Sequence, residues 1–314
     1  MNRPALFLTN DDGIEAPGLI RLIEALHARG FPVVVMAPAR EQSASGMRLS
    51  LRHDLRFVER DDLAAVIRQE NGPALRMFSL DGTPCDCVIV ALDGGLAHWT
   101  PDIQPALCVS GVNQGPNLSV DVMHSGTVSA AREAGLYGMP ALASSLATYE
   151  HADFEQSVAA TVEIIEACTA VLPTLPLNLL RPNGSRNVPE GEHERELIIS
   201  SFANGNLMLN INGPQNWTNG YQTVTLGARW YHNAIDMSDT EHIGVAYRVG
   251  AAQIEDEDIA GTDCNAIIEG STAITPLSSW PVNHPLGMSQ RLLSAATQSG
   301  ESGMPFWLES AGIE

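Results

Sequence analysis

Two adjacent carboxylates directly follow a short apolar segment near the start of the chain. The apolar segment and the carboxylates together read Leu6-Phe7-Leu8-Thr9-Asn10-Asp11-Asp12-Gly13, and an amphipathic stretch follows them. A buried strand, a turn and a helix in this order open many α/β domains, in which ligands bind just outside the carboxyl ends of the strands. Because adjacent carboxylates repel each other, Asp11 and Asp12 favour a hard cation with oxygen ligands as their partner.

Three more polar segments are expected to follow strands of the same sheet. Their carboxylate, hydroxyl and amide oxygens suit Mg²⁺, Mn²⁺ or Ca²⁺ rather than a metal that prefers thiolates. The start of a helix would also offer free N–H groups and hydroxyls to a phosphate. The candidate residues are Ser43 in the segment 40–46, Asn113 and Asn117 in the segment 110–117, and Ser125, Gly126 and Thr127 at the helix start.

Each of these segments also has a purely structural explanation. Asp-Asp-Gly is often a turn in which an Asp caps the next helix, and Asn113 and Asn117 could simply satisfy turn backbone. Ser43 lies in a segment rich in Ser and Gly that is typical of a solvated loop, and Ser125 or Thr127 could serve only as a helix N-cap. Function is favoured because the four segments occur together.

Strand and helix patterns alternate through the first half of the chain. Leu19, Leu22, Ile23 and Leu26 fall at helical spacing, for example, and a glycine follows them at position 30. Such alternation predicts an α/β fold with a Rossmann-like, doubly wound and mostly parallel sheet. We expect strands at 5–9, 33–37, 106–109 and 140–144, an extended or hairpin segment at 54–80, and helices at 83–93, 126–138 and 154–165.

The pattern changes after about residue 172. Residues 1–172 are predicted to form the α/β core, and residues 173–205, which are rich in turn-forming residues at 182–195, a probable insertion or loop. Residues 206–314 are predicted to form a β-rich C-terminal part with oligomerisation elements and a tail. Its expected strands are residues 207–211, 223–226, 245–248 and 273–275.

The composition excludes several classes of protein. The 314 residues carry a net charge of −20, and all 17 basic residues are arginines. The absence of lysine excludes a P-loop and a Schiff-base lysine, and the acidity disfavours binding to nucleic acid or to an anionic membrane. Five scattered cysteines, and no segment that resembles a signal peptide or a membrane span, predict a cytoplasmic protein. A phosphate substrate would need local neutralisation by a metal, an arginine or backbone N–H groups.

Several long motifs occur in order along the first half of the chain. They occupy residues 8–14, 37–43, 81–88, 110–117 and 125–128, with shorter matches at 209–214, 261–263 and 275–277. In these motifs the sequence resembles the SurE (survival protein E) family of metal-dependent 5′-nucleotidases. The resemblance is dense over about residues 5–146, and it implies a Rossmann-like core with a β-rich C-terminal portion used in homodimer or homotetramer contacts.

The resemblance also implies roles for the candidate residues. One divalent cation, Mg²⁺ or Mn²⁺ with Ca²⁺ as another occupant, would be held by Asp11, Asp12, Ser43 and Asn113. The phosphate of a nucleoside 5′-monophosphate would be bound by Asn117, Ser125, Gly126 and Thr127. Asp11 and Asp12 are the candidate catalytic residues: either could act as general base for a water, and attack by an Asp to give an aspartyl-phosphate is the alternative chemistry.

Other functions remain open on the sequence. A dinucleotide-dependent oxidoreductase is disfavoured, because the first turn reads Asn-Asp-Asp-Gly rather than Gly-x-Gly-x-x-Gly and its acids would repel a pyrophosphate. A nucleotide-binding protein without catalysis on the same scaffold, and a phosphatase with another phosphorylated substrate, are the two remaining alternatives.

Overall fold

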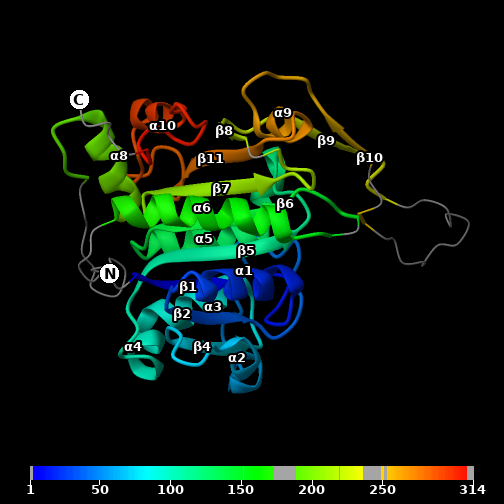
Figure 1. The fold of residues 1–314 in the computed structure, drawn as a ribbon. Coiled ribbons are helices and arrows are strands. Elements are labelled where there is room, and N and C mark those ends of the chain that lie inside the picture. Colours follow the sequence, from blue (N-terminus) through cyan, green and yellow to red (C-terminus); the bar gives the residue numbers. More distant parts are fainter. Residues whose placement is uncertain are drawn as a thin grey trace, which may run out of the picture.

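The strands of the first half are buried on both faces, so their side chains divide between two hydrophobic cores. In β1 (Ala5–Thr9), Leu6 and Leu8 lie in one core and Phe7 in the other, since successive side chains of a strand point to opposite faces. Helices cover both cores, as Figure 1 shows. These helices are α1 (Pro17–Ala28) and α6 (Glu155–Val171) on one face, and α3 (Pro84–Val90) and α5 (Gly126–Leu136) on the other.

The computed structural model describes residues 3–150, 152–172, 189–218, 220–235, 249–250 and 253–309. Within these residues it has a nine-stranded sheet of order β3-β4-β2-β1-β5-β6-β7-β11-β8. The six strands from β4 to β7 are parallel, and β3 and β11 pair antiparallel to their neighbours β4 and β7. The predicted α/β, mostly parallel, Rossmann-like sheet is therefore confirmed. The other strands are β2 (Val33–Pro38), β3 (Phe57–Glu59), β4 (Leu75–Leu80), β5 (Pro105–Gln114), β6 (Ala141–Leu146), β7 (Leu207–Gly213), β8 (Tyr221–Thr223) and β11 (Thr272–Ser278).

The strand order reverses between β1 and β5. From β1 the chain continues to β2 and β4 on one side, and it later returns to β5, β6 and β7 on the other. In open α/β sheets such a reversal leaves a crevice at the carboxyl ends of the two central strands, where ligands bind. The predicted residues Asp11 and Asp12 follow β1, and Asn113 lies at the end of β5, so all three lie at this crevice.

Two segments of the first half differ from the prediction. The segment 54–80, expected to be extended or a hairpin, contains the helix α2 (Asp61–Ile67) between β3 and β4. Asp61 and Asp62 lie in its first turn, where acidic residues stabilise a helix N-terminus. The prediction missed this signal because the residues on either side have the pattern of strands. The helix predicted at 83–93 ends as α3 at Val90 and continues as a kinked turn, because Gly94 has a positive φ, before α4 (Leu96–Trp99).

The C-terminal half joins the same sheet. β7 and β11 confirm the strands expected at 207–211 and 273–275, although β11 continues through Pro276 instead of ending before it. This is tolerated because β8 pairs only with Thr272–Ile274, so β11 has a free edge at the proline. The strand expected at 245–248 lies outside the described residues. The sheet passes from β6 to β7 without interruption, and the division at residues 172 and 205 stays a prediction.

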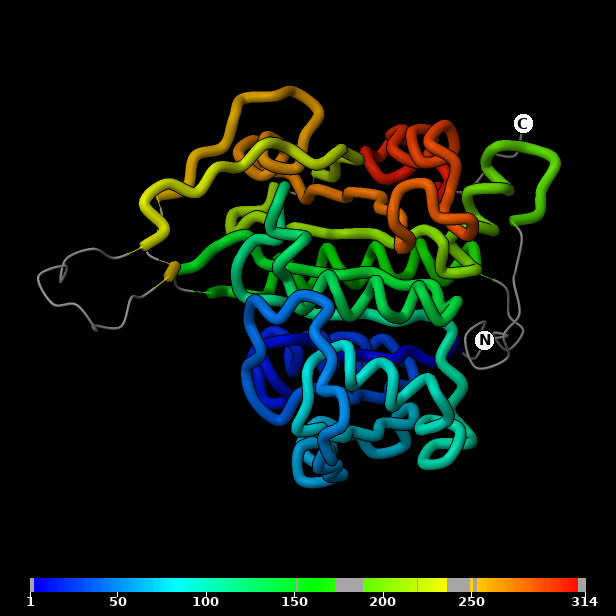
Figure 2. The backbone as a smooth tube through the Cα atoms, turned by 180° about the vertical axis from the view of Figure 1, so that it is seen from behind, coloured from blue at the N-terminus to red at the C-terminus, as the bar shows by residue number. Residues whose placement is uncertain are grey.

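The remaining C-terminal elements cover this end of the sheet, as the view from behind shows (Figure 2). The C-terminal tail expected from the sequence is part of the core, because Trp307 is fully buried against Phe202. No helix among the described residues is long and apolar enough to cross a membrane. The additional elements are α8 (Glu194–Ala203), α9 (Asp263–Ile268), α10 (Gln290–Ala296), the short helix η2 (Ser119–Met123), and a separate two-stranded sheet of β9 (Arg229–His232) and β10 (Gln253–Asp256).

Candidate active site

The turn after β1 presents the two carboxylates at the crevice. Asn10 closes this turn, because its side-chain amide donates to the carbonyl oxygen of Gly13 (2.9 Å) and its Oδ1 accepts the N–H of Gly13 (3.2 Å). Gly13 has a φ of +104°, a conformation that favours glycine. The apolar strand buries the start of the turn, so that Asp11 is 3% exposed, whereas Asp12 is partly accessible.

Asp11 packs against the first turn of α5. The Thr127 hydroxyl donates a hydrogen bond to Asp11 Oδ1. A Cβ atom at Gly126 would lie 2.7 Å from the Cβ of Asp11, so only glycine lets the helix start this close to the carboxylate. Burial raises the pKa of Asp11, and the hydrogen bond from Thr127 and the nearby backbone N–H groups oppose this rise. The helix start predicted to meet a phosphate therefore also supports Asp11.

Asp12 is held by β5. Its Oδ2 accepts the backbone N–H of Gln114 at 3.0 Å. Burial, together with the neighbouring charge of Asp11 and then that of Glu41, raises the pKa of Asp12 to about 7. No arginine of the described chain forms an ion pair with either carboxylate. The turn thus places two carboxylates side by side without an ion-pair partner among the described residues.

Asn113 completes a group of oxygens around Asp11. Its Nδ2 donates to the carbonyl oxygen of Gly115 (2.9 Å), which leaves Oδ1 facing the Thr127 hydroxyl at 3.4 Å. The sequence predicted Asn113 in a loop. In the structure it is the second-last residue of β5, which extends to Gln114. The structure therefore brings together Asp11, Asn113 and Thr127 from three separate segments.

Ser43 lies near this group, but its hydroxyl is directed elsewhere. The side chain is exposed and donates to Glu41 Oε1 at 2.8 Å. Its loop is attached to the site, since the N–H of Gln42 donates to the carbonyl oxygen of Asp11 at 2.7 Å. The sequence reasoning missed Ser45 in the same loop. Its Oγ is buried, has no hydrogen-bond partner in the described chain, and lies 2.6 Å from where a Cβ of Gly126 would be.

Ser125 and Asn117 both have structural partners. The Ser125 hydroxyl caps α5 by accepting the N–H of Val128 at 3.0 Å. Asn117 donates from Nδ2 to Ser145 Oγ at 2.7 Å, and its carbonyl oxygen accepts the side-chain amides of Asn210 and Asn212. The N-cap explanation is thus realised for Ser125. The phosphate roles of both residues stay predictions.

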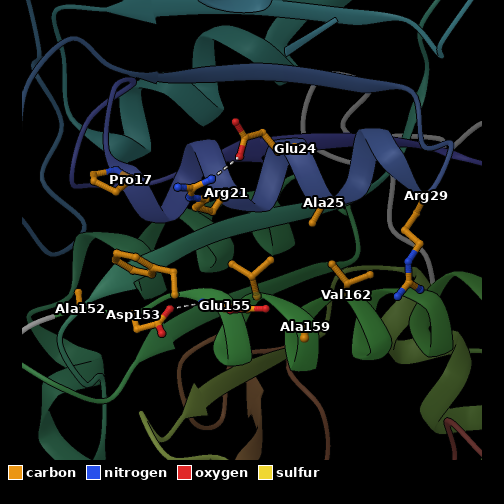
Figure 3. Close-up of a pocket in the computed structure, with 12 residues that line it drawn as sticks. Pro17, Arg21, Glu24, Ala25, Arg29, Ala152, Asp153, Glu155, Ala159 and Val162 are labelled. Carbon is orange, nitrogen blue, oxygen red and sulfur yellow. Dashed lines mark hydrogen bonds and ion pairs between the residues drawn. The ribbon is translucent and has the colours of Figure 1, made fainter. Parts of the chain in front are cut away.

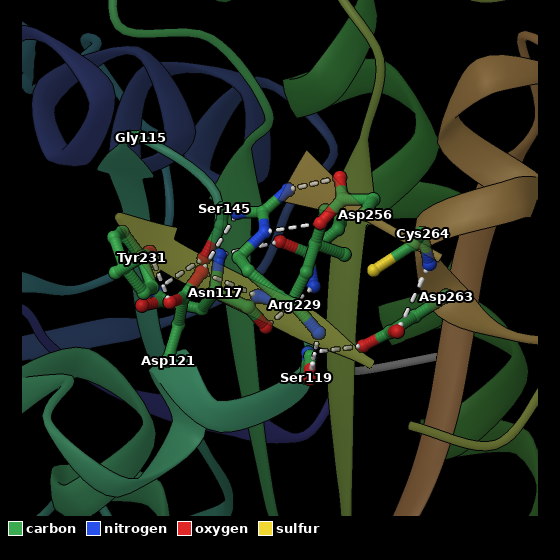
Figure 4. A network of polar contacts seen from close by, with 12 residues as sticks. Gly115, Asn117, Ser119, Asp121, Ser145, Arg229, Tyr231, Asp256, Asp263 and Cys264 are labelled. Atoms are coloured by element: carbon green, nitrogen blue, oxygen red, sulfur yellow. Dashed lines mark hydrogen bonds and ion pairs between the residues drawn. The ribbon is translucent and has the colours of Figure 1, made fainter. Parts of the chain in front are cut away.

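A buried ion network that the sequence reasoning did not find supports the approach to α5 (Figure 4). Arg229 of β9 donates to Asp121 Oδ2 at 2.9 Å, and it forms a two-pronged pair with Asp256 at 2.7 and 2.8 Å. The Tyr231 hydroxyl donates to the other oxygen of Asp121. Asp121 lies in η2, directly before α5, so the network holds β9 and β10 against the segment that leads into the site.

A second buried carboxylate, Asp263, supports the same segment. It is fully buried and accepts the N–H groups of Ser119 (2.9 Å) and Gly227 (2.7 Å). Only the short motif at 261–263 could have indicated it. Asp256 lies 27 residues from Arg229, and Gly227 lies 36 residues from Asp263, so the spacing of residues gave no signal for either contact.

The oxygens at the crevice fit a hard divalent cation. The described chain holds no cluster of three or more His, Cys, Asp or Glu side chains placed to bind a metal. A cation here would therefore use the carboxylates of Asp11 and Asp12 together with neutral oxygens, of which Asn113 Oδ1 faces the group. This set of donors suits Mg²⁺, Mn²⁺ or Ca²⁺ and not a metal that needs thiolates.

Comparison with known proteins decides the family. The sequence profile described as Survival protein SurE matches residues 6–233, a region that runs from β1 to β9 and includes every predicted site residue. The chain belongs to the SurE family. This confirms the resemblance seen in the sequence motifs.

Individual SurE proteins resemble the chain over most of its length. It is 35% identical to the 5′-nucleotidase SurE of Anaeromyxobacter sp. (strain Fw109-5) over 274 residues, which cover 87% of this chain and 89% of that protein. It is 36% identical to the 5′-nucleotidase SurE of Geotalea uraniireducens (strain Rf4), covering 87% and 92%. The crystal structure of the SurE protein from Aquifex aeolicus superposes with a TM-score of 0.60 at 26% identity, covering 89% and 95%.

Proposed function

We propose that the chain is a divalent-metal-dependent phosphomonoesterase that hydrolyses nucleoside 5′-monophosphates to nucleoside and phosphate. The observation that carries this proposal is the pair Asp11 and Asp12, uncompensated by any cation of the described chain, at the reversal point of a SurE sheet. The SurE relatives named above are called 5′-nucleotidases, which fits this site.

We assign Asp11, Asp12 and Asn113 as ligands of one divalent cation, with Ser43 joining them after its hydroxyl leaves Glu41. Mg²⁺ or Mn²⁺ is the expected ion, and Ca²⁺ fits the same oxygens. When bound, the cation would polarise the phosphoryl oxygens and lower the pKa of a coordinated water.

The other site residues position the substrate and move a proton. At the start of α5 the N–H groups of Gly126 and Thr127 interact with Asp11, so an equatorial oxygen of the transferred phosphoryl group would share these donors with the carboxylate. Asp12 is the more accessible carboxylate, so it is the better general base for the attacking water. Asp11 is buried and bonded to Thr127, which makes an aspartyl-phosphate on it the less favoured route; trapping a phosphoenzyme would reverse this ranking.

Phosphate release from a panel of nucleoside 5′-monophosphates tests the proposal directly. We expect release with Mn²⁺ or Mg²⁺, and its loss on addition of EDTA, because the carboxylates alone would repel the phosphate. Circular dichroism in EDTA checks that the metal-free protein stays folded. Nucleotide binding without release with any metal would favour the non-catalytic alternative, and release only from other phosphate esters would favour a different phosphatase.

Replacement of Thr127 by valine should weaken metal binding roughly 10-fold or more, which is the usual cost of removing a group that orients a metal ligand. Valine keeps the shape of the side chain but removes the hydroxyl that donates to Asp11. Isothermal titration of Mn²⁺ into the metal-free protein measures the effect. Thr127→Ser, which keeps the hydroxyl, is the matched control, and equal affinity of the two variants would refute a role for this hydrogen bond.

We also propose a homodimer or homotetramer and a cytoplasmic location. The first follows from the family resemblance, in which the C-terminal portion makes the contacts between subunits. The second follows from five cysteines that are all buried and unpaired. Light scattering coupled to gel filtration measures the first, and fractionation of cells that express the protein measures the second.

A further inference from the structure

A pocket of about 810 Å³ opens beside Asp12. Its lining consists of Pro17, Gln114, Tyr149, Glu150, Ala152 and Phe154. Gln114 links the pocket to the carboxylates, because it lines the pocket and its backbone N–H donates to Asp12 Oδ2. The preceding residue, Asn113, contributes to the proposed metal ligands. The pocket therefore begins where the proposed phosphate site ends.

Tyr149 is an exposed but well-oriented aromatic ring in this pocket. Its side chain is 60% exposed. The ring lies over Gly115, where a Cβ atom would be 3.1 Å from Tyr149 Cε1 and would push the ring by a few tenths of an ångström. Its hydroxyl interacts with that of Tyr231, which in turn donates to Asp121 of the buried network. The ring thus lies between Gly115 and Tyr231 and stays accessible.

We infer that this pocket is the nucleoside subsite and that the base stacks on Tyr149. This inference rests on the proposed 5′-nucleotidase function. It adds the position of the base and the reason that the site binds a base. Stacking on an aromatic ring is available to every base, since each has a π face. A site built this way recognises the nucleoside without specifying one base.

The other walls of the pocket fit the same occupant. Pro17, Ala152 and Phe154 supply apolar surface, while the amide of Gln114 and the carboxylate of Glu150 are hydrogen-bonding groups suited to ribose hydroxyls. The three apolar residues also line a groove of about 750 Å³ between α1 and α6 (Figure 3). The pocket therefore adjoins this groove, which leaves room for a purine as well as a pyrimidine.

Comparison of a nucleotide with a base-free phosphate ester tests the inference. In Tyr149→Ala we expect kcat/KM for AMP to fall roughly 5- to 100-fold, the range that the loss of one aromatic–base stack gives. Most of this fall should appear in KM, because the stack is made equally in the ground state and the transition state. Hydrolysis of ribose 5-phosphate, which has no base, should be unchanged.

Two variants and the wild-type protein separate the outcomes. Tyr149→Phe keeps the ring and should retain most of the AMP activity, and Trp230→Ala removes another half-exposed aromatic ring that does not line the pocket and should have no effect. An equal loss for AMP and ribose 5-phosphate, or no loss for AMP, would overturn the subsite while leaving the nucleotidase proposal intact. Wild-type protein that hydrolyses neither ester with any metal would instead refute the proposed function.

Discussion

Asp12→Asn is expected to lower hydrolysis of nucleoside 5′-monophosphates by roughly 10²- to 10³-fold or more, the loss that follows removal of a group acting on transition-state charge. The substitution removes one carboxylate of the proposed metal site and the proposed general base together. The Asn side chain still offers an oxygen to the N–H of Gln114, so the local geometry should persist. Steady-state phosphate release with saturating Mn²⁺ measures the loss.

The same variant should make the metal-free protein more stable. Burial and the charge of Asp11 raise the pKa of Asp12 from 3.8 to about 7, so the fold favours the protonated carboxyl. Stability from this group is fully present below pH 3.8 and is lost as the pH rises through 7. At pH 8 the asparagine avoids this loss, which we place at about 1–2 kcal/mol of unfolding free energy after allowing for solvent screening.

Thermal unfolding in EDTA between pH 5 and pH 8 measures this effect. The wild-type Tm should fall more steeply with rising pH than that of Asp12→Asn, and added Mn²⁺ should stabilise the wild type more than the variant, since a ligand stabilises the state that binds it. Asp102→Asn, at an exposed carboxylate away from the site, is the matched control. It should change neither the pH dependence of Tm nor the stabilisation by Mn²⁺. Near-normal hydrolysis by Asp12→Asn would show that the reaction needs neither the negative charge of Asp12 nor its action as a general base.

The position of the main site residues could be predicted because local sequence and topology determine it together. An apolar strand followed by Asn10 and Gly13 fixes the turn that carries the two carboxylates. Once the strands are parallel, the segments after β1 and β5 must reach the same edge of the sheet, which brings Asn113 to Asp11. The start of α5 reaches this edge for the same reason.

The partners of individual side chains could not be predicted in this way. A serine hydroxyl can donate to any nearby acceptor, and nothing in the sequence shows that Ser43 bonds to Glu41 while Ser45 lies buried beside Gly126. Long-range pairs are also hidden, since Arg229 and Asp121 are 108 residues apart. Tyr149 belongs to no motif, and its importance depends on a pocket that only the folded chain forms.

Arg229→Ala is expected to destabilise the protein by about 3–5 kcal/mol, the usual cost of breaking a buried ion pair from one side. The side chain of Arg229 is only 6% exposed, and those of its partners Asp121 and Asp256 are 10% and 20% exposed. Alanine would leave both carboxylates buried without a positive partner. Urea unfolding followed by circular dichroism measures the change.

Arg60→Ala provides the control for this prediction, because Arg60 also pairs with two acids. Those acids, Glu15 and Asp62, are 67% and 63% exposed, so water can replace the arginine. The loss for Arg60→Ala should therefore stay near 0–1 kcal/mol, roughly the value of surface pairs. If Arg229→Ala and Arg60→Ala lowered the free energy of unfolding by the same small amount, the network of Arg229 would have to be open to solvent.

The triple variant Arg229→Met, Asp121→Asn, Asp256→Asn should recover much of the stability lost in Arg229→Ala. Replacing a buried ion network by neutral groups of similar size often costs little, since the main penalty of the single variant is the charge left without a partner. Activity should recover less than stability, because Asp121 orients η2 directly before the start of α5 and also holds Tyr231. A triple variant as unstable as the single one would mean that the cost lies in lost packing of the guanidinium, and a triple variant with full activity would mean that the network stabilises the fold without positioning the site.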